Sequence, residues 1–241
     1  MRRIFNTQNL MRFILLSFVA SVVYLTVRVI IAPAVAPPSD VPINIKGDYA
    51  LMLLESALGV AAMLLPRFLS RRVRLDIPKG MITAYAIFLY CAIFLGEVRN
   101  FYYTVPHWDT ILHTFSGVAT GALGFSIVSL LNKSDDIAFS LSPFFVALFA
   151  FCFALSLGVI WEFYEFTIDS LFDLNMQKYA LETGEPLFGQ AALMDTMKDL
   201  IVDALGALLM AIVGYISLKY KKGWLEQFIV RRKGADKHNE P

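Results

Sequence analysis

The sequence predicts an all-α polytopic membrane protein, a helical bundle of about six transmembrane helices, and two observations support this fold class. First, 57% of the 241 residues are hydrophobic, only 17% are charged, and the mean hydropathy is +0.60, which is too apolar for an ordinary soluble domain. Second, the apolar residues form runs long enough to cross the hydrocarbon core of a bilayer. We therefore expect residues 1–241 to form a single integral membrane domain.

The apolar runs define six spans, each close to the roughly 20 residues that a membrane helix needs. The predicted spans are, at about these bounds, 13–32, 49–66, 80–96, 112–131, 143–166 and 199–218. The second span is expected to end at Pro66, because proline interrupts helices. The runs are too long for barrel strands and show no alternation of apolar and polar residues.

Lysine and arginine predict how the spans are oriented. They concentrate at the amino terminus, between the second and third spans, and in a basic tail over residues 219–241. These residues are Arg2, Arg3, Arg12, Arg67, Arg71, Arg72, Arg74, Lys79, Lys219, Lys221, Lys222, Arg231, Arg232, Lys233 and Lys237. Under the positive-inside rule they belong on the cytoplasmic side, and an even number of spans then places both termini in the cytoplasm. The acidic connection over residues 170–195 falls outside, and its length makes it a candidate lid.

The first span has a second interpretation. Residues 1–36 have a basic start, an apolar run and an Ala34-Val35-Ala36 stretch that resembles a signal-peptidase site. The apolar run is long for a signal core and contains Arg28, which favours a retained span. Arg28 and Glu55 both fall in the outer halves of their spans, so an ion pair between them is one expectation.

Three segments carry acidic and histidine residues at helical spacing, and the predicted topology places all three at the outer face. The segments contain Asp109 and His113, then Glu162, Glu165 and Asp169, then Asp195, Asp199 and Asp203. Each set lies on one side of its own helix. Ionisable groups at membrane depth are costly and rare, so their concentration predicts a functional site.

The composition of this cluster indicates its chemistry. Carboxylates packed together must take up protons or bind a cation, and a mixture of carboxylate and imidazole suits Mg, Mn, Fe or Zn. The predicted metal ligands are Asp109, His113, Glu165, Asp199 and Asp203, and these residues together with Glu162 are the catalytic candidates. Arg99 is expected to bind an anionic substrate group such as phosphate. Asp195 is also a candidate helix N-cap, with Thr196 as the alternative cap.

Small residues recur on two of the spans that carry the cluster. Gly117, Gly121 and Gly124 lie along one face of the fourth span, and Gly206 and Gly214 along one face of the sixth. Small residues let helix backbones approach closely inside a membrane. We therefore expect these glycines to mark helix–helix contacts.

The order of the motifs resembles a known family. Trp108-Asp109-x-x-x-His113, Trp161-Glu162-x-x-Glu165 and Asp195-Thr196-x-x-Asp199-x-x-x-Asp203-x-x-Gly206 are similar to the YjdF-type bacterial inner-membrane proteins and, more distantly, to VanZ-like proteins. The resemblance covers roughly residues 50–220 and implies a bacterial cytoplasmic-membrane protein; for VanZ-like members it implies a link to glycopeptide-antibiotic resistance. VanZ-like chains tend to carry Gln in place of Glu165 and Asn in place of Asp203, so this cluster is more acidic.

The leading hypothesis is a metal-dependent enzyme or lipid-handling protein that acts on an envelope lipid or lipid-linked substrate from within the bilayer, without a nucleic-acid partner. A proton- or cation-coupled transporter is the first alternative, although it predicts polar groups throughout the membrane depth, and few lie in the inner halves. A non-catalytic scaffold, whose polar cluster only holds helices together, is the second alternative.

Overall fold

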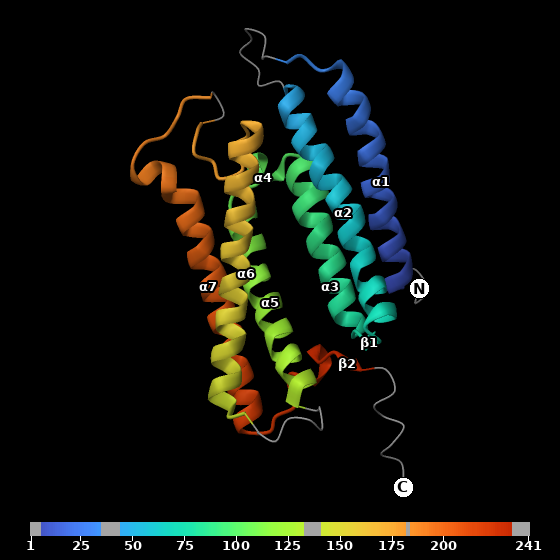
Figure 1. Cartoon of the computed structure of the whole chain (residues 1–241), viewed down its shortest axis with the longest axis vertical. Coiled ribbons are helices and arrows are strands. Elements are labelled where there is room, and N and C mark those ends of the chain that lie inside the picture. Colours follow the sequence, from blue (N-terminus) through green and yellow to red (C-terminus); the bar gives the residue numbers. More distant parts are fainter. Residues whose placement is uncertain (1–5, 35–43, 133–140, 182–183, 233–241) are drawn as a thin grey trace. The chain divides into compact units, whose positions relative to one another are not determined.

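The computed structural model describes residues 6–34, 44–132, 141–181 and 184–232, and within these ranges the fold is all-α apart from two short strands and one isolated bridge. The elements follow one another along the chain as Figure 1 shows. They are α1 (Thr7–Ile31), α2 (Lys46–Arg72), β1 (Leu75–Asp76), α3 (Lys79–Leu89), the π-helix η1 (Tyr90–Val98), α4 (Phe101–Thr104), α5 (Trp108–Asn132), α6 (Pro143–Phe172), α7 (Gln190–Lys219), the 3-10 helix η2 (Glu226–Phe228) and β2 (Arg231–Arg232).

The prediction of six spans is confirmed. Among the described residues, six helical segments are long and apolar enough to cross a membrane, with α3 and η1 together forming the third. The sixth helix begins at Gln190 rather than near residue 199, so Asp195 lies inside it and its predicted role as N-cap is wrong. Parts of the orientation and signal-peptide arguments lie outside the described residues, namely Arg2, Arg3, Val35, Ala36, Lys233 and Lys237.

The chain divides into two compact units, and α2, α3, α6 and α7 each contribute to both. Unit 1 comprises residues 1–65, 83–108 and 164–192, and unit 2 comprises residues 66–82, 109–163 and 193–241. The expectation of a single membrane domain stays a prediction.

Unit 1 is held by two apolar clusters. In the first, Ile14 and Phe18 of α1 pack with Met63 of α2 and Leu89 of α3. In the second, Leu25 of α1 packs with residues of α2 that include Met52. The aromatic and aliphatic residues of α1 therefore bury one face of that helix, while Phe13, Leu16, Val23 and Ile30 stay exposed.

Unit 2 has its core between α5, α6 and α7. Phe125 of α5, Ala150 of α6 and Met210 of α7 belong to one buried cluster, which Leu225 of the following segment joins. The chain after α7 is also fixed by a hydrogen bond, because the backbone N–H of Val230 donates to Ser126 Oγ at 2.7 Å.

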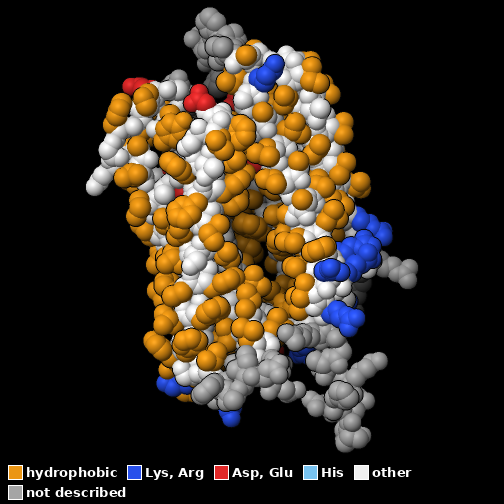
Figure 2. Space-filling view, viewed as in Figure 1, with side chains coloured by type: hydrophobic (Ala, Val, Ile, Leu, Met, Phe, Trp, Pro, Cys, Tyr) orange, Lys and Arg blue, Asp and Glu red, His pale blue; other side chains and the backbone are white. Residues whose placement is uncertain are grey.

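The outward surfaces of the helices are strongly apolar. Figure 2 shows hydrophobic side chains over the helices of both units. Large exposed side chains occur on every spanning helix, for example Phe144 on α6 and Leu205 on α7. Exposed apolar surface on this scale suits lipid rather than water.

Pro66 lies inside α2 and does not end it, contrary to the sequence-based expectation. A proline in a helix cannot donate to the carbonyl four residues earlier, which leaves the carbonyl of Ala62 without its helical donor. The hydroxyl of Tyr85 on α3 donates to that carbonyl at 3.0 Å. A side chain from another helix thus satisfies the freed backbone group, as is required where no water is available.

The connection after α6 has its own hydrogen-bonded structure. Asp169 is buried, and its two carboxylate oxygens accept the backbone N–H groups of Met176 and Gln177 at 2.7 and 2.9 Å. Asn175 then both donates to and accepts from the backbone of Ala180. Asp169 therefore organises this connection, and a lid role for the connection stays a prediction.

The two strands join distant parts of the chain. β1 pairs antiparallel with β2, with Leu75 opposite Arg232 and Asp76 opposite Arg231 (Figure 1). Four spans separate the strands along the chain, and an even number returns the chain to the same side of a membrane. The pairing thus brings together two of the three basic segments, in agreement with the division of Lys and Arg.

The strand pairing predicts a labelling pattern. Single cysteines at positions 76 and 231, in a background without Cys91 and Cys152, should both react with a membrane-impermeant maleimide from the same side of the membrane. A cysteine at position 180 should react only from the opposite side, because an odd number of spans separates it from each strand. Labelling of positions 76 and 231 from opposite sides would contradict the pairing.

The Pro66–Tyr85 relationship predicts a coupled effect on stability. Tyr85→Phe should lower the free energy of unfolding by about 1–3 kcal/mol, because the Ala62 carbonyl loses its donor. In a Pro66→Ala background the backbone N–H at position 66 can bond to that carbonyl, so Tyr85→Phe should then have little effect. Thermal or denaturant unfolding in detergent micelles measures the four variants of this double-mutant cycle. Equal effects of Tyr85→Phe in both backgrounds would refute the proposed coupling.

Candidate functional site

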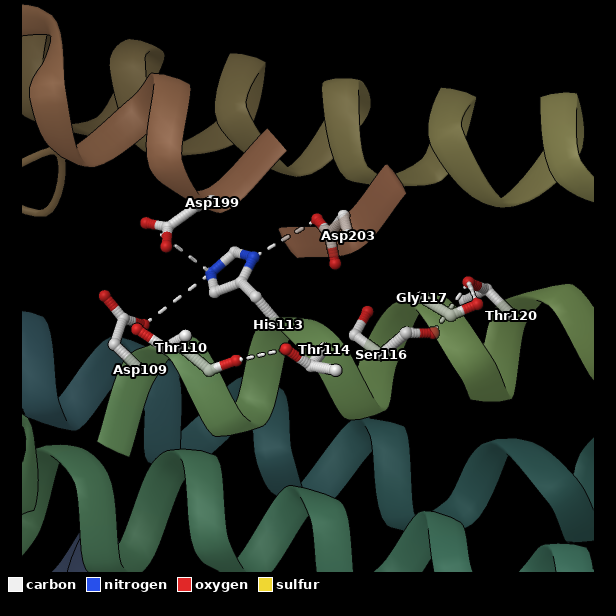
Figure 3. A network of polar contacts seen from close by, with 9 residues as sticks. All are labelled: Asp109, Thr110, His113, Thr114, Ser116, Gly117, Thr120, Asp199 and Asp203. Carbon is white, nitrogen blue, oxygen red and sulfur yellow. Dashed lines mark hydrogen bonds and ion pairs between the residues drawn. The ribbon is translucent and has the colours of Figure 1, made fainter. Parts of the chain in front are cut away.

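The centre of the candidate site is the imidazole of His113 on α5. Nε2 of His113 lies 3.6 Å from Asp109 Oδ1 and 4.0 Å from Asp199 Oδ2, and Nδ1 lies 3.2 Å from Asp203 Oδ2. Figure 3 shows the ring between α5 and α7, with a carboxylate toward each of its nitrogen atoms. All four residues belong to unit 2.

Helical spacing explains why these side chains meet. Asp109 and His113 are four residues apart on α5, and Asp199 and Asp203 are four residues apart on α7, so each pair lies on one face of its helix. The two faces are turned toward each other. The sequence spacing correctly predicted the pairs, although it does not determine which ring nitrogen each carboxylate contacts.

Two glycines allow α5 and α7 to approach closely at this level. A Cβ atom on Gly117 would lie 2.3 Å from the backbone oxygen of Asp203, and one on Gly206 would lie 2.4 Å from that of Thr114. Both distances are far below van der Waals contact. The predicted role of these glycines in helix contacts is confirmed, and the contact holds His113 beside the carboxylates of α7.

The site combines burial with an excess of negative charge. Asp199 and Asp203 are each only 2% exposed, and the side chains of His113 and Asp109 are 11% and 16% exposed. Three carboxylates surround one imidazole, so even a protonated ring would leave two negative charges if all three were ionised. Such charge is costly in a low-dielectric interior unless protons or a cation compensate it.

The geometry on the Nε2 side is close to that of a metal site. One donor atom each from Asp109, His113 and Asp199 lie within 4.8 Å of one another. Metal–ligand bonds of about 2.0–2.2 Å at a tetrahedral angle place donors about 3.4 Å apart. The distances from His113 Nε2 to the two carboxylates, 3.6 and 4.0 Å, require only small side-chain movements to reach that value.

Asp203, expected among the ligands, is separate from this donor group because it contacts the opposite ring nitrogen. Its second oxygen, Oδ1, is buried and has no hydrogen-bond partner in the described part of the chain. Glu162 is buried on α6 in the same unit but is not one of the three grouped donors.

The remaining predicted residues lie in unit 1. Glu55 of α2 interacts electrostatically with Glu97 of η1 and with Glu165 of α6, and Tyr164 is close enough to interact with the same three carboxylates. Arg99 is exposed immediately after η1. Its role in binding an anion stays a prediction.

Sequence reasoning expected Glu55 to pair with Arg28, and this expectation is wrong. Arg28 instead donates to the hydroxyl of Tyr49 and lies over its ring, 4.6 Å from the centroid. Glu55 is buried and belongs to the acidic group of unit 1. An acidic residue inside an apolar run was a usable signal, but its partners come from spans distant in sequence.

A π-helix places Glu97 in that acidic group. Residues 90–98 follow the wider π geometry, in which Arg99 N–H reaches the carbonyl of Phe94, and the indole of Trp108 donates to the carbonyl of Cys91 at 3.2 Å. π-helical segments occur often at functional sites. Nothing in the hydropathy of this span indicates the change of helix type.

Comparison with known proteins agrees with this architecture. The family model described as "Predicted membrane protein (DUF2238)" matches residues 10–220. The chain belongs to this family. The matched range includes the whole of α5, α6 and α7, and therefore every residue of the site.

One relative matches part of the chain. An uncharacterized protein of Thermotoga maritima is 32% identical over 123 residues, which are 50% of this chain and 54% of the relative. The chain thus spans about half the length of this curated relative. No solved structure matches the chain.

The helix contact beneath the site predicts a difference between two glycine substitutions. Gly206→Ala should destabilise the fold by about 1–3 kcal/mol, because the new methyl group meets the backbone of Thr114. Gly80→Ala is the matched control: nothing lies within 4 Å of its Cβ position, and alanine favours helix by up to about 1 kcal/mol. Thermal unfolding in micelles compares them, and equal effects would contradict the close contact.

Proposed function

We propose that this protein binds a divalent metal ion through Asp109, His113 and Asp199 and uses it to act on an envelope amphiphile in a bacterial cytoplasmic membrane. The observation that carries the proposal is the grouping of these three donors within 4.8 Å, at a partly buried position inside a membrane-spanning unit. The resemblance to YjdF-type and VanZ-like proteins supports the choice of membrane.

The number and type of donors favour a reactive rather than a purely structural metal. Structural zinc sites are closed by four protein ligands, whereas catalytic sites have three and keep a position for water or substrate. Two carboxylates and one imidazole match the donor types that suit Zn, Fe and Mn, with Mg favoured less because of the nitrogen donor. A bound metal would polarise a substrate oxygen or lower the pKa of a bound water.

The apolar surroundings support an amphiphilic substrate. The helices that carry the donors expose large hydrophobic side chains, so a substrate reaching the site from the bilayer keeps its apolar part in lipid. A polar head group is then the part that meets the metal. A role for Arg99 of unit 1 in binding an anionic group remains a separate proposal.

Metal analysis of purified protein tests the proposal. The wild type should bind Zn²⁺, Mn²⁺ or Fe²⁺ stoichiometrically, and Asp109→Asn and Asp199→Asn should each weaken binding by more than about 100-fold, because each removes a ligand. At a metal concentration about 100 times Kd, binding should stabilise the wild-type fold by about 2.7 kcal/mol.

The control for this experiment is Asp173→Asn, which removes the same charge from an exposed position outside the site. It should leave both metal content and metal-induced stabilisation unchanged. A wild type that binds none of these ions, with thermal stability independent of each, would refute the metal proposal.

A second candidate is proton- or cation-coupled transport, and one observation favours it. Glu55 is buried in a spanning helix and interacts with Glu97 and Glu165. Carboxylates inside transporters act as proton or ion relays. A metal-free wild type that moves protons in liposomes, and loses this property in Glu55→Gln, would favour this candidate.

A further inference from the structure

Asp203 differs from the other two carboxylates in its relation to His113. Asp109 and Asp199 approach Nε2, whereas Asp203 Oδ2 lies 3.2 Å from Nδ1 (Figure 3). The two ring nitrogens of an imidazole face in different directions, so one metal ion cannot bind both. A contact to Nδ1 therefore has a role different from that of a ligand beside Nε2.

We infer that Asp203 is a positioning residue that fixes the orientation and tautomer of His113, and that Gly158 of α6 makes room for it; this inference rests on the proposed metal function. In this assignment Asp203 is the acceptor and Nδ1 carries the proton, because an ionised carboxylate can only accept a hydrogen bond. A neutral ring with its proton on Nδ1 has its lone pair on Nε2, toward Asp109 and Asp199. Histidine ligands usually have such a partner, which also makes the ring a better donor.

The surroundings of Asp203 support this role. Its side chain is 3% exposed and comes from the middle of α7, where it has little freedom to turn. Its backbone oxygen lies against Gly117 of α5, so the close helix contact fixes its height relative to His113. Within the described part of the chain, the Asp203 side chain forms its hydrogen bond with the imidazole of His113.

Gly158 adds a contribution from a third helix. A Cβ atom on Gly158 would lie 2.7 Å from Asp203 Oδ2 and 3.3 Å from its Cγ. Oδ2 is the oxygen that contacts His113, so any larger residue at position 158 would push this oxygen out of place. Glycine inside a helix lowers its stability. The space that Asp203 Oδ2 needs is a physical reason for glycine at this position.

Co²⁺ titration with visible absorption tests the assignment, because the spectrum reports ligands and geometry while the titration reports affinity. Asp203→Ala should weaken Co²⁺ binding by about 10–100-fold while the absorption bands keep their positions. Asp203→Asn should lose less, because its amide oxygen can still accept from Nδ1–H. Gly158→Ala should resemble Asp203→Ala. Ser156→Ala, an exposed position on the same helix, should match the wild type.

Two outcomes of the titration would overturn the inference. If Asp203→Asn shifts the absorption bands as Asp109→Asn does, Asp203 is a ligand. If Asp203→Ala leaves the affinity for Co²⁺ unchanged, Asp203 has only a structural role. A wild type that binds neither Co²⁺ nor the ions tested above refutes the proposed function, which is a separate result.

The metal-free protein offers an independent measurement. In protein labelled with ¹⁵N-histidine, with His113→Gln used for assignment, Nδ1 of His113 should carry a proton. Its resonance should move in Asp203→Ala and Gly158→Ala but not in Ser156→Ala. An unprotonated Nδ1 in the wild type, or an Nδ1 resonance that does not move in Asp203→Ala, would overturn the positioning role. This result holds even if metal binding fails.

Discussion

The close contact between α5 and α7 is the constraint on which the candidate site depends. Gly117 and Gly206 bring the two backbones together where any side chain would collide with a carbonyl oxygen. Lipid tails are as apolar as the helices, so packing and polar contacts rather than hydrophobic burial stabilise such a contact. The same approach places His113 among carboxylates that would be too costly to bury singly. In unit 2, the same contact between α5 and α7 therefore determines both the helix packing and the geometry of the site.

Backbone satisfaction is the second constraint, and it shapes unit 1. Pro66 leaves the carbonyl of Ala62 without a helical donor, and the hydroxyl of Tyr85 donates to it. Trp108 likewise donates to a carbonyl of the π-helix η1. In both cases a polar aromatic side chain supplies a donor that water would supply in a soluble protein. The cost of irregular backbone is offset locally, which permits η1 to place Glu97 near Glu55.

The sequence predicted the parts of the structure that depend on composition and local spacing. Apolar length determines a membrane span, and an i, i+4 relationship determines a helix face, so the six spans and the pairs on α5 and α7 were predictable. Pro66 misled the prediction because its consequence depends on Tyr85, a residue from another helix. Which nitrogen Asp203 contacts, and the need for glycine at position 158, depend on three helices at once. No pattern within one segment contains that information.

The histidine is what distinguishes the two acidic groups of the chain. In unit 1, Glu55, Glu97 and Glu165 offer only oxygen donors, which suit protons and hard cations equally. In unit 2, an imidazole adds a nitrogen donor of fixed direction, and Asp203 occupies the nitrogen that faces away from the other carboxylates. A cluster that served only to hold helices together would need no such division between the two ring nitrogens. The separation of contacts around His113 therefore supports metal binding more strongly than the amount of negative charge does.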